Sequence, residues 1–98
     1  MTETAEADLA EIWAYIAEDS EEAARRLIDK IMTTLARAQD FPMSGAARDQ
    51  LARGLRAMFQ GNYALYYMFT ETEVILVRVL HGARDAAAIA EQGGFSFP

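Results

Sequence analysis

The first forty residues show the apolar spacing of two amphipathic helices. Leu9, Ile12, Trp13 and Ile16 recur at intervals that place them on one face of a helix. Thr2 can cap the N-terminus of this helix, because a threonine hydroxyl accepts a hydrogen bond from a free backbone N–H. We expect this apolar face, Trp13 included, to pack against a sheet.

A second helix is predicted to begin after Ser20, its cap, and to end before Pro42, which cannot continue it. Its apolar face again follows the helical repeat and comprises Ala24, Leu27, Ile28, Ile31, Met32, Leu35 and Ala38. The link between the two helices is very short, so they should form an antiparallel hairpin.

The second half of the chain has the residue types of strands. Three segments rich in aromatic and β-branched residues, 55–59, 63–69 and 74–80, are separated by gaps of hairpin length. Segment 46–53 fits a short helical turn or a loop, and 86–91 a short helix. The expected fold is α+β, a single domain over residues 1–98. A helical hairpin packs on a three-stranded antiparallel sheet, followed by a short C-terminal helix.

Composition excludes several classes of protein. The 98 residues include no cysteine and one histidine, which excludes disulfides, thiolate metal sites and a histidine-rich metal centre, and we expect no cofactor. No apolar run is long enough to span a membrane, and the acidic start argues against a secretory signal, so we expect a cytoplasmic protein.

The net charge of −6 comes from the first half of the chain. Residues 1–40 carry ten acidic and four basic side chains, whereas residues 41–98 carry five of each, and all five of those bases are arginine. An acidic partner would therefore bind the second half.

Segment 80–85 is the most promising candidate for chemistry, because it follows the last predicted strand, where functional loops commonly lie. It contains the one histidine, a glycine and an Arg-Asp pair: His81, Gly82, Arg84 and Asp85. The same residues also suit a structural turn followed by a helix cap. Arg56 and Arg78 favour the functional interpretation, since an arginine on a strand with apolar neighbours needs a partner or a groove.

Several segments, taken in order, resemble the ParE branch of the ParE/RelE toxins of bacterial type II toxin–antitoxin systems. Residues 5–19 resemble the family's first helix, and Ala24 together with residues 28–31 resembles its second. Phe41-Pro42 and Gly45 resemble the junction between helices and sheet, and residues 54–56, 63–67 and 77–85 resemble the three strands. The resemblance implies a toxin that blocks DNA gyrase and is neutralised by a ParD-like antitoxin. The RelE branch uses this fold as a ribosome-dependent mRNA endonuclease, and a non-toxic binding module is a third interpretation.

The residues favour gyrase inhibition over RNA cleavage. Cleavage needs cations at the phosphate and a general acid and base, so in a nuclease Arg56, Arg78 and His81 would be catalytic. However, the second half has no lysine, and an acidic protein is poorly suited to binding ribosomal RNA. We therefore expect a binding protein without enzymatic activity, and no direct contact with nucleic acid or membrane.

The antitoxin segment of this family is typically acidic and amphipathic, so it should bind an apolar groove edged with arginine. The candidate residues for binding the antitoxin or the target are Arg56, Tyr63, Tyr67, Met68, Arg78, His81, Arg84 and Asp85. Tyr63 and Tyr67 suit the core equally well.

The chain departs from the family in one respect. The family's first strand normally precedes the first helix, whereas here only residues 2–4 do so. Either the chain starts late or the sheet lacks this strand, and a missing strand would expose an edge to pairing by a partner. We therefore expect the chain to be stable mainly in a complex.

Overall fold

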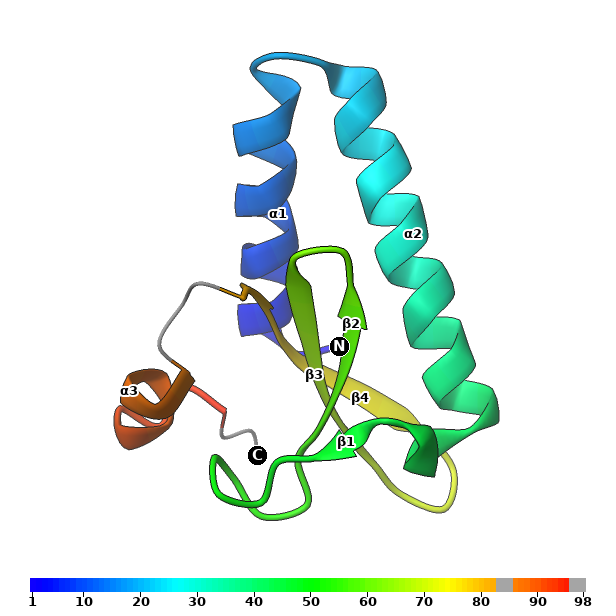
Figure 1. Cartoon of the computed structure of the whole chain (residues 1–98), viewed down its shortest axis with the longest axis vertical. Helices are drawn as coiled ribbons and strands as arrows, with labels where there is room; N and C mark the ends of the chain where they lie inside the picture. Colours follow the sequence, from blue (N-terminus) through cyan, green and yellow to red (C-terminus); the bar gives the residue numbers. More distant parts are fainter. Residues whose placement is uncertain (83–85, 96–98) are drawn as a thin grey trace.

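Two long helices precede an antiparallel sheet and a short third helix (Figure 1). The computed structural model describes residues 1–82 and 86–95. The elements are α1 (Glu3–Ala17), α2 (Glu21–Asp40), the 3₁₀ turn η1 (Pro42–Ser44), β1 (Ala46–Ala47), β2 (Arg56–Gln60), β3 (Tyr63–Phe69), β4 (Val74–His81) and α3 (Ala86–Glu91). The predicted α+β class, the helical hairpin and the C-terminal helix are confirmed.

Both predicted helix caps are present. The hydroxyl of Thr2 accepts a hydrogen bond from the backbone N–H of Ala5 at 3.0 Å, and that of Ser20 accepts one from Ala23 at 3.1 Å. Each bond satisfies a backbone donor that the first turn of a helix leaves without a partner. The sequence signals that begin the helices therefore act locally, as expected.

The sheet has four antiparallel strands in the order β1-β2-β3-β4, one more than the sequence predicts. The additional strand, β1, lies in the segment that fitted either a turn or a loop, and it pairs only with Arg56 and Ala57 of β2. A strand of two alanines has no alternation of apolar and polar residues, so periodicity cannot reveal it. It forms because residues 48–55 reverse the chain, so that β2 returns antiparallel to β1.

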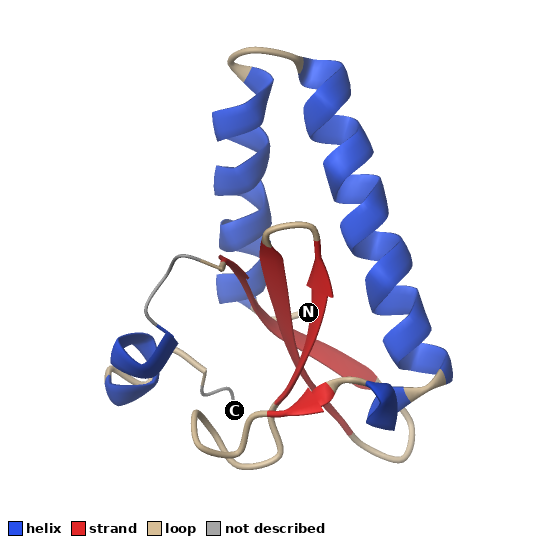
Figure 2. Cartoon of the chain, in the orientation of Figure 1, coloured by secondary structure: helices blue, strands red, loops and turns tan. Residues whose placement is uncertain are grey.

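The two faces of the sheet are covered by different parts of the chain. Both helices of the hairpin pack on one face, α1 on β4 and α2 on β2 and β4, as predicted. The core on this face consists of Ala5, Ile31, Leu35, Leu65, Leu76 and Val79. Figure 2 shows the two helices side by side and α3 well apart from them.

The opposite face of the sheet carries a second core, which the apolar pattern of the sequence does not predict. Its buried members are Leu55, Ala57, Ala64, Tyr66, Val77, Leu80 and Phe95, with Ile89 and Ala90 of α3 packed against them. Phe95 is only 1% exposed, and its ring meets that of Tyr66 edge to face at 4.8 Å. The segment that follows α3 therefore closes this face.

The prediction that Trp13 packs in the core is wrong. Its side chain is 39% exposed and belongs to neither core. In Figure 1 the helical hairpin extends well beyond the strands, so the later turns of α1 have no sheet beneath them. None of the helices in the described ranges is both long and apolar enough to cross a membrane.

Candidate interaction site

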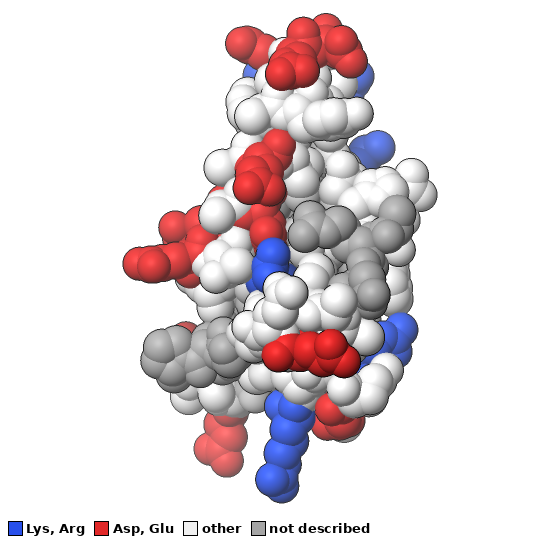
Figure 3. All heavy atoms as spheres, turned by 90° about the vertical axis from the view of Figure 1, so that its left-hand side faces the viewer, with Lys and Arg blue, Asp and Glu red and all other residues white. Residues whose placement is uncertain are grey.

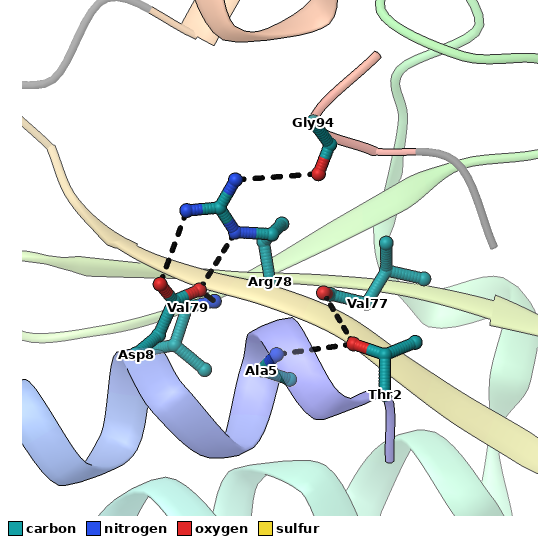
Figure 4. Close-up of polar contacts among 7 residues, drawn as sticks. All are labelled: Thr2, Ala5, Asp8, Val77, Arg78, Val79 and Gly94. Carbon is teal, nitrogen blue, oxygen red and sulfur yellow. Dashed lines mark hydrogen bonds and ion pairs between the residues drawn. The ribbon is translucent and has the colours of Figure 1, made fainter.

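Arg78 of β4 forms a buried ion pair with Asp8 of α1 (Figure 4). Its Nε lies 2.8 Å from Oδ2 of Asp8 and its Nη2 lies 3.1 Å from Oδ1, a two-point contact. The backbone N–H of Val79 donates to the same carboxylate at 3.0 Å, and Arg78 Nη1 donates to the carbonyl of Gly94 at 3.3 Å. The two charged side chains are only 13% and 10% exposed. Arg78 thus joins α1, β4 and the C-terminal segment.

Hydrogen bonding to Asp8 raises the pKa of Arg78 above its ordinary value. The negative charges of Asp8 and Glu11 act in the same direction, and together they outweigh burial, which lowers it. A raised pKa means that the stabilisation is complete below the unfolded-state pKa and is lost only as the pH rises through the folded-state pKa. The arginine side of this pair therefore stays charged until strongly alkaline pH.

The start of α1 covers part of the outer edge of β4. The backbone N–H of Thr2 donates to the carbonyl of Leu76 at 3.0 Å, and its hydroxyl donates to that of Val77 at 2.8 Å. With the contact from Asp8 to Val79, this edge is occupied from residue 76 to residue 79. The expectation of an exposed sheet edge is therefore wrong for this part of β4, because the backbone and hydroxyl of Thr2 and the carboxylate of Asp8 replace a neighbouring strand.

Arg56 of β2 holds the turn between α2 and β1. Its Nη1 donates to the carbonyl of Gly45 at 2.7 Å and to that of Met43 at 3.2 Å. Its guanidinium lies 6.0 Å from the centre of the Phe69 ring. This arginine, like Arg78, directs donors at the protein's own backbone.

Tyr67 is a core residue, as one of the two interpretations of the sequence held. Its side chain is buried, its hydroxyl donates to the carbonyl of Pro42 at 2.6 Å, and it accepts from the N–H of Gly45 at 3.0 Å. A Cβ at Gly45 would collide with the tyrosine hydroxyl, so the close approach requires glycine.

Tyr63 and His81 meet at the neighbouring ends of β3 and β4, with their rings edge to face at 5.4 Å. Tyr63 is half-buried, and His81 is exposed. Met68 is half-buried and packs against the second core. Arg84 and Asp85 lie outside the described residues. The structure therefore brings Tyr63 and His81 together but distributes the other candidates over separate contacts.

An apolar groove between α2 and β2 was missed by sequence reasoning. Its lining consists of Thr34, Arg37, Phe41, Ser44, Gly45, Ala46, Ala57, Met58 and Phe59, and its volume is about 560 Å³. Phe41 is 69% and Phe59 56% exposed, and the guanidinium of Arg48 lies 5.9 Å from the centre of the Phe59 ring. We call this feature the α2–β2 groove. Phe41 lies outside the apolar faces of both predicted helices, and this was the one indication of the groove in the sequence.

Charge is distributed unevenly over the surface. Figure 3 views the side on which α1 lies, where acidic side chains cover much of the upper part and gather at the hairpin turn. Among the described residues, no group of three or more potential ligands could hold a metal ion. Arg56 and Arg78, which a nuclease would need at the phosphate, instead donate hydrogen bonds to Gly45 and Asp8 of the protein itself.

A helical hairpin on an antiparallel sheet, with strand arginines bonded internally and an exposed apolar groove, defines a small α+β domain suited to binding another protein. The family model described as "ParE toxin of type II toxin-antitoxin system, parDE" matches residues 1–86. The chain belongs to this family of ParE toxins. Comparison with curated proteins gave no match.

Proposed function

We propose that this type II toxin blocks DNA gyrase and thereby replication, and that a ParD-like antitoxin neutralises it. Membership of the ParE family establishes the toxin class and implies an antitoxin partner. The observation that supports gyrase inhibition over RNA cleavage is the internal bonding of Arg56 and Arg78.

Cleavage of RNA would require these cations at the scissile phosphate. Releasing Arg78 for that role would leave Asp8 buried without its partner, at a cost of several kcal/mol. The acidic surface over α1 would also repel an RNA backbone. Of the three residues that a nuclease would use, Arg56, Arg78 and His81, this leaves His81 alone for the chemistry, which supports a protein that acts by binding.

The test is to induce the chain alone in bacteria and to pulse-label DNA and protein synthesis. We expect DNA synthesis to stop first, and the purified chain to inhibit supercoiling by gyrase. If protein synthesis stops first, with mRNA cut at defined sites, the nuclease interpretation replaces this one.

The variant His81→Ala separates the two mechanisms further. A nuclease that uses His81 as its acid or base should lose cutting by about 10²–10⁴-fold. A gyrase inhibitor should keep its effect on supercoiling within a few-fold.

A third outcome of the pulse-labelling is that DNA synthesis and protein synthesis both continue in cells that contain the protein. The chain would then be a non-toxic binding module, and only its complex with the antitoxin would remain to be measured.

A further inference from the structure

The edge of β2 is only partly covered by β1. The register pairs Ala57 with Ala46 of β1, but no residue of β1 lies beside Phe59. In an antiparallel ladder the backbone groups of alternate residues point to opposite sides, so those of Phe59 point the same way as those of Ala57, away from β3. Within the described residues no strand pairs with Phe59 on this side, so its N–H and C=O form a short open edge to which a further strand could bond.

This open edge borders the α2–β2 groove. The exposed rings of Phe41 and Phe59 stand at the groove, while Ala46 and Ala57 leave room between them. Large apolar side chains exposed beside a hollow are unfavourable in water, and their burial by a partner would be favourable. The open edge and the groove thus offer one partner both backbone bonds and apolar contact.

The charge at the groove has the opposite sign to that of the whole chain. Among the described residues, Arg37 is the only charged one that lines the groove, and Arg48 lies against the ring of Phe59. Within the described residues Arg37 makes one long contact, 3.4 Å from Nη2 to the hydroxyl of Thr34, so it can turn to a carboxylate. In a protein of net charge −6, two arginines without an acidic lining residue select a negatively charged partner.

We infer that the groove binds an extended segment of the antitoxin, which adds a strand to β2 at Phe59. Alternate apolar side chains of this segment enter the groove, and a carboxylate pairs with Arg37 or Arg48. The inference rests on the proposed function only for the source of the segment. A helical segment would use the apolar groove but not the backbone edge, and so fits the observations less well.

The probe is a synthetic peptide, acetyl-Glu-Val-Glu-Val-Glu-Val-amide, titrated into the ¹⁵N-labelled chain and followed by NMR. We expect saturable shifts centred on residues 57–60 and 34–37. The counterpart with lysine in place of glutamate should bind at least 5-fold more weakly. A peptide with alternate backbone nitrogens methylated should bind at least 10-fold more weakly, because it cannot complete the ladder.

Three variants separate the contributions of the edge N–H, the Phe59 ring and the Arg37 charge to peptide binding. Phe59→Pro removes the edge N–H without touching the bonds to β3, and should weaken binding about 10-fold, whereas Phe59→Ala keeps the N–H and should lose about 3-fold. Arg37→Gln should lose about 3-fold. Arg25→Gln, an exposed arginine near the other end of α2, is the matched control and should bind as the parent does.

Several outcomes would overturn the inference: equal binding of the glutamate and lysine peptides, parent-like binding by a folded Phe59→Pro variant, or shifts centred on β4. Concentration-dependent dimerisation through the groove would assign it to a second copy of the chain. If Phe59→Pro unfolds, the methylated peptide decides between the outcomes. Gyrase inhibition by the chain with no peptide binding would reject the inference while leaving the proposed function intact.

Discussion

Single polar residues connect distant parts of this molecule. Among the described residues, no buried side-chain polar atom lacks a hydrogen-bond partner. The carboxylate of Asp8, for example, accepts hydrogen bonds from two nitrogens of Arg78 and from the backbone N–H of Val79. A charge buried in this way is tolerable only while all its partners remain in place.

We therefore expect Asp8→Asn to lower the free energy of unfolding by about 3–5 kcal/mol, since it leaves the Arg78 cation buried without its counter-charge. Urea unfolding followed by circular dichroism measures this change. The matched control is Glu22→Gln, which removes an acid from the exposed pair with Arg26 and should cost no more than about 0.5 kcal/mol. Equal effects of the two variants on the free energy of unfolding would show that the buried Asp8–Arg78 pair contributes no more to stability than an exposed pair.

At the scale of elements, α1 is both a helix and a cover for the edge of β4. Its cap, Thr2, has two functions, because its hydroxyl accepts from Ala5 within the helix and donates to Val77 on the strand. Ser20 caps α2, and its side chain accepts a hydrogen bond from Ala23 within the same helix. A comparison of the two caps therefore distinguishes the contribution of helix capping to stability from that of attachment to the sheet.

Thr2→Ala should destabilise the protein by about 2 kcal/mol, and Ser20→Ala by about 1 kcal/mol, since only the first also removes a bond to β4. Thermal or urea unfolding compares the two, and Thr2→Ser should restore most of the loss. Amide exchange at residues 76–79 should increase in Thr2→Ala but not in Ser20→Ala. Equal costs, with no change in exchange, would contradict a role for Thr2 on the strand.

The segment after α3 makes a comparable contribution to the opposite face. Phe95→Ala should lower the free energy of unfolding by about 3–5 kcal/mol, because it removes a buried ring from the second core. Phe41→Ala removes an exposed ring and should stay within about 0.5 kcal/mol. A small effect of Phe95→Ala in chemical denaturation would mean that the second core does not depend on the C-terminal segment.

At the scale of the whole molecule, two thin cores enclose the sheet. Alanine supplies several of their buried side chains, namely Ala5, Ala57 and Ala64, and Ala24 and Ala38 of α2 are buried as well. Each buries much less apolar area than a leucine would, so the hydrophobic contribution to stability is modest. The exposed rings at the α2–β2 groove add surface that is better covered than left in water.

We therefore still expect the chain to be stable mainly in a complex. A partner that binds only the folded state stabilises it by mass action, so the midpoint of thermal unfolding should rise as antitoxin is added. Calorimetry and light scattering on the chain with and without its antitoxin measure this effect. A purified, monodisperse monomer that melts cooperatively would contradict the prediction.

Local signals in the sequence determined the helices, most of the strands and the fold class. Caps such as Thr2 and Ser20, the stop at Pro42 and the helical spacing of apolar residues act between near neighbours, so they can be read without knowledge of the fold. The segments at 63–69 and 86–91 were likewise recognisable from their residue types. The resemblance to ParE toxins depended on the order of these same segments, and the family comparison confirms it.

Only the tertiary structure decided how the candidate site residues are used. Asp8 and Arg78 are 70 positions apart, and no periodicity links two residues at that distance. The burial of Phe95, the two-residue strand β1 and the exposure of Trp13 depend likewise on where the sheet ends and what covers each face. The sequence identified arginines that needed partners, and the packing of α1, β4 and the η1 turn supplied those partners from within the protein.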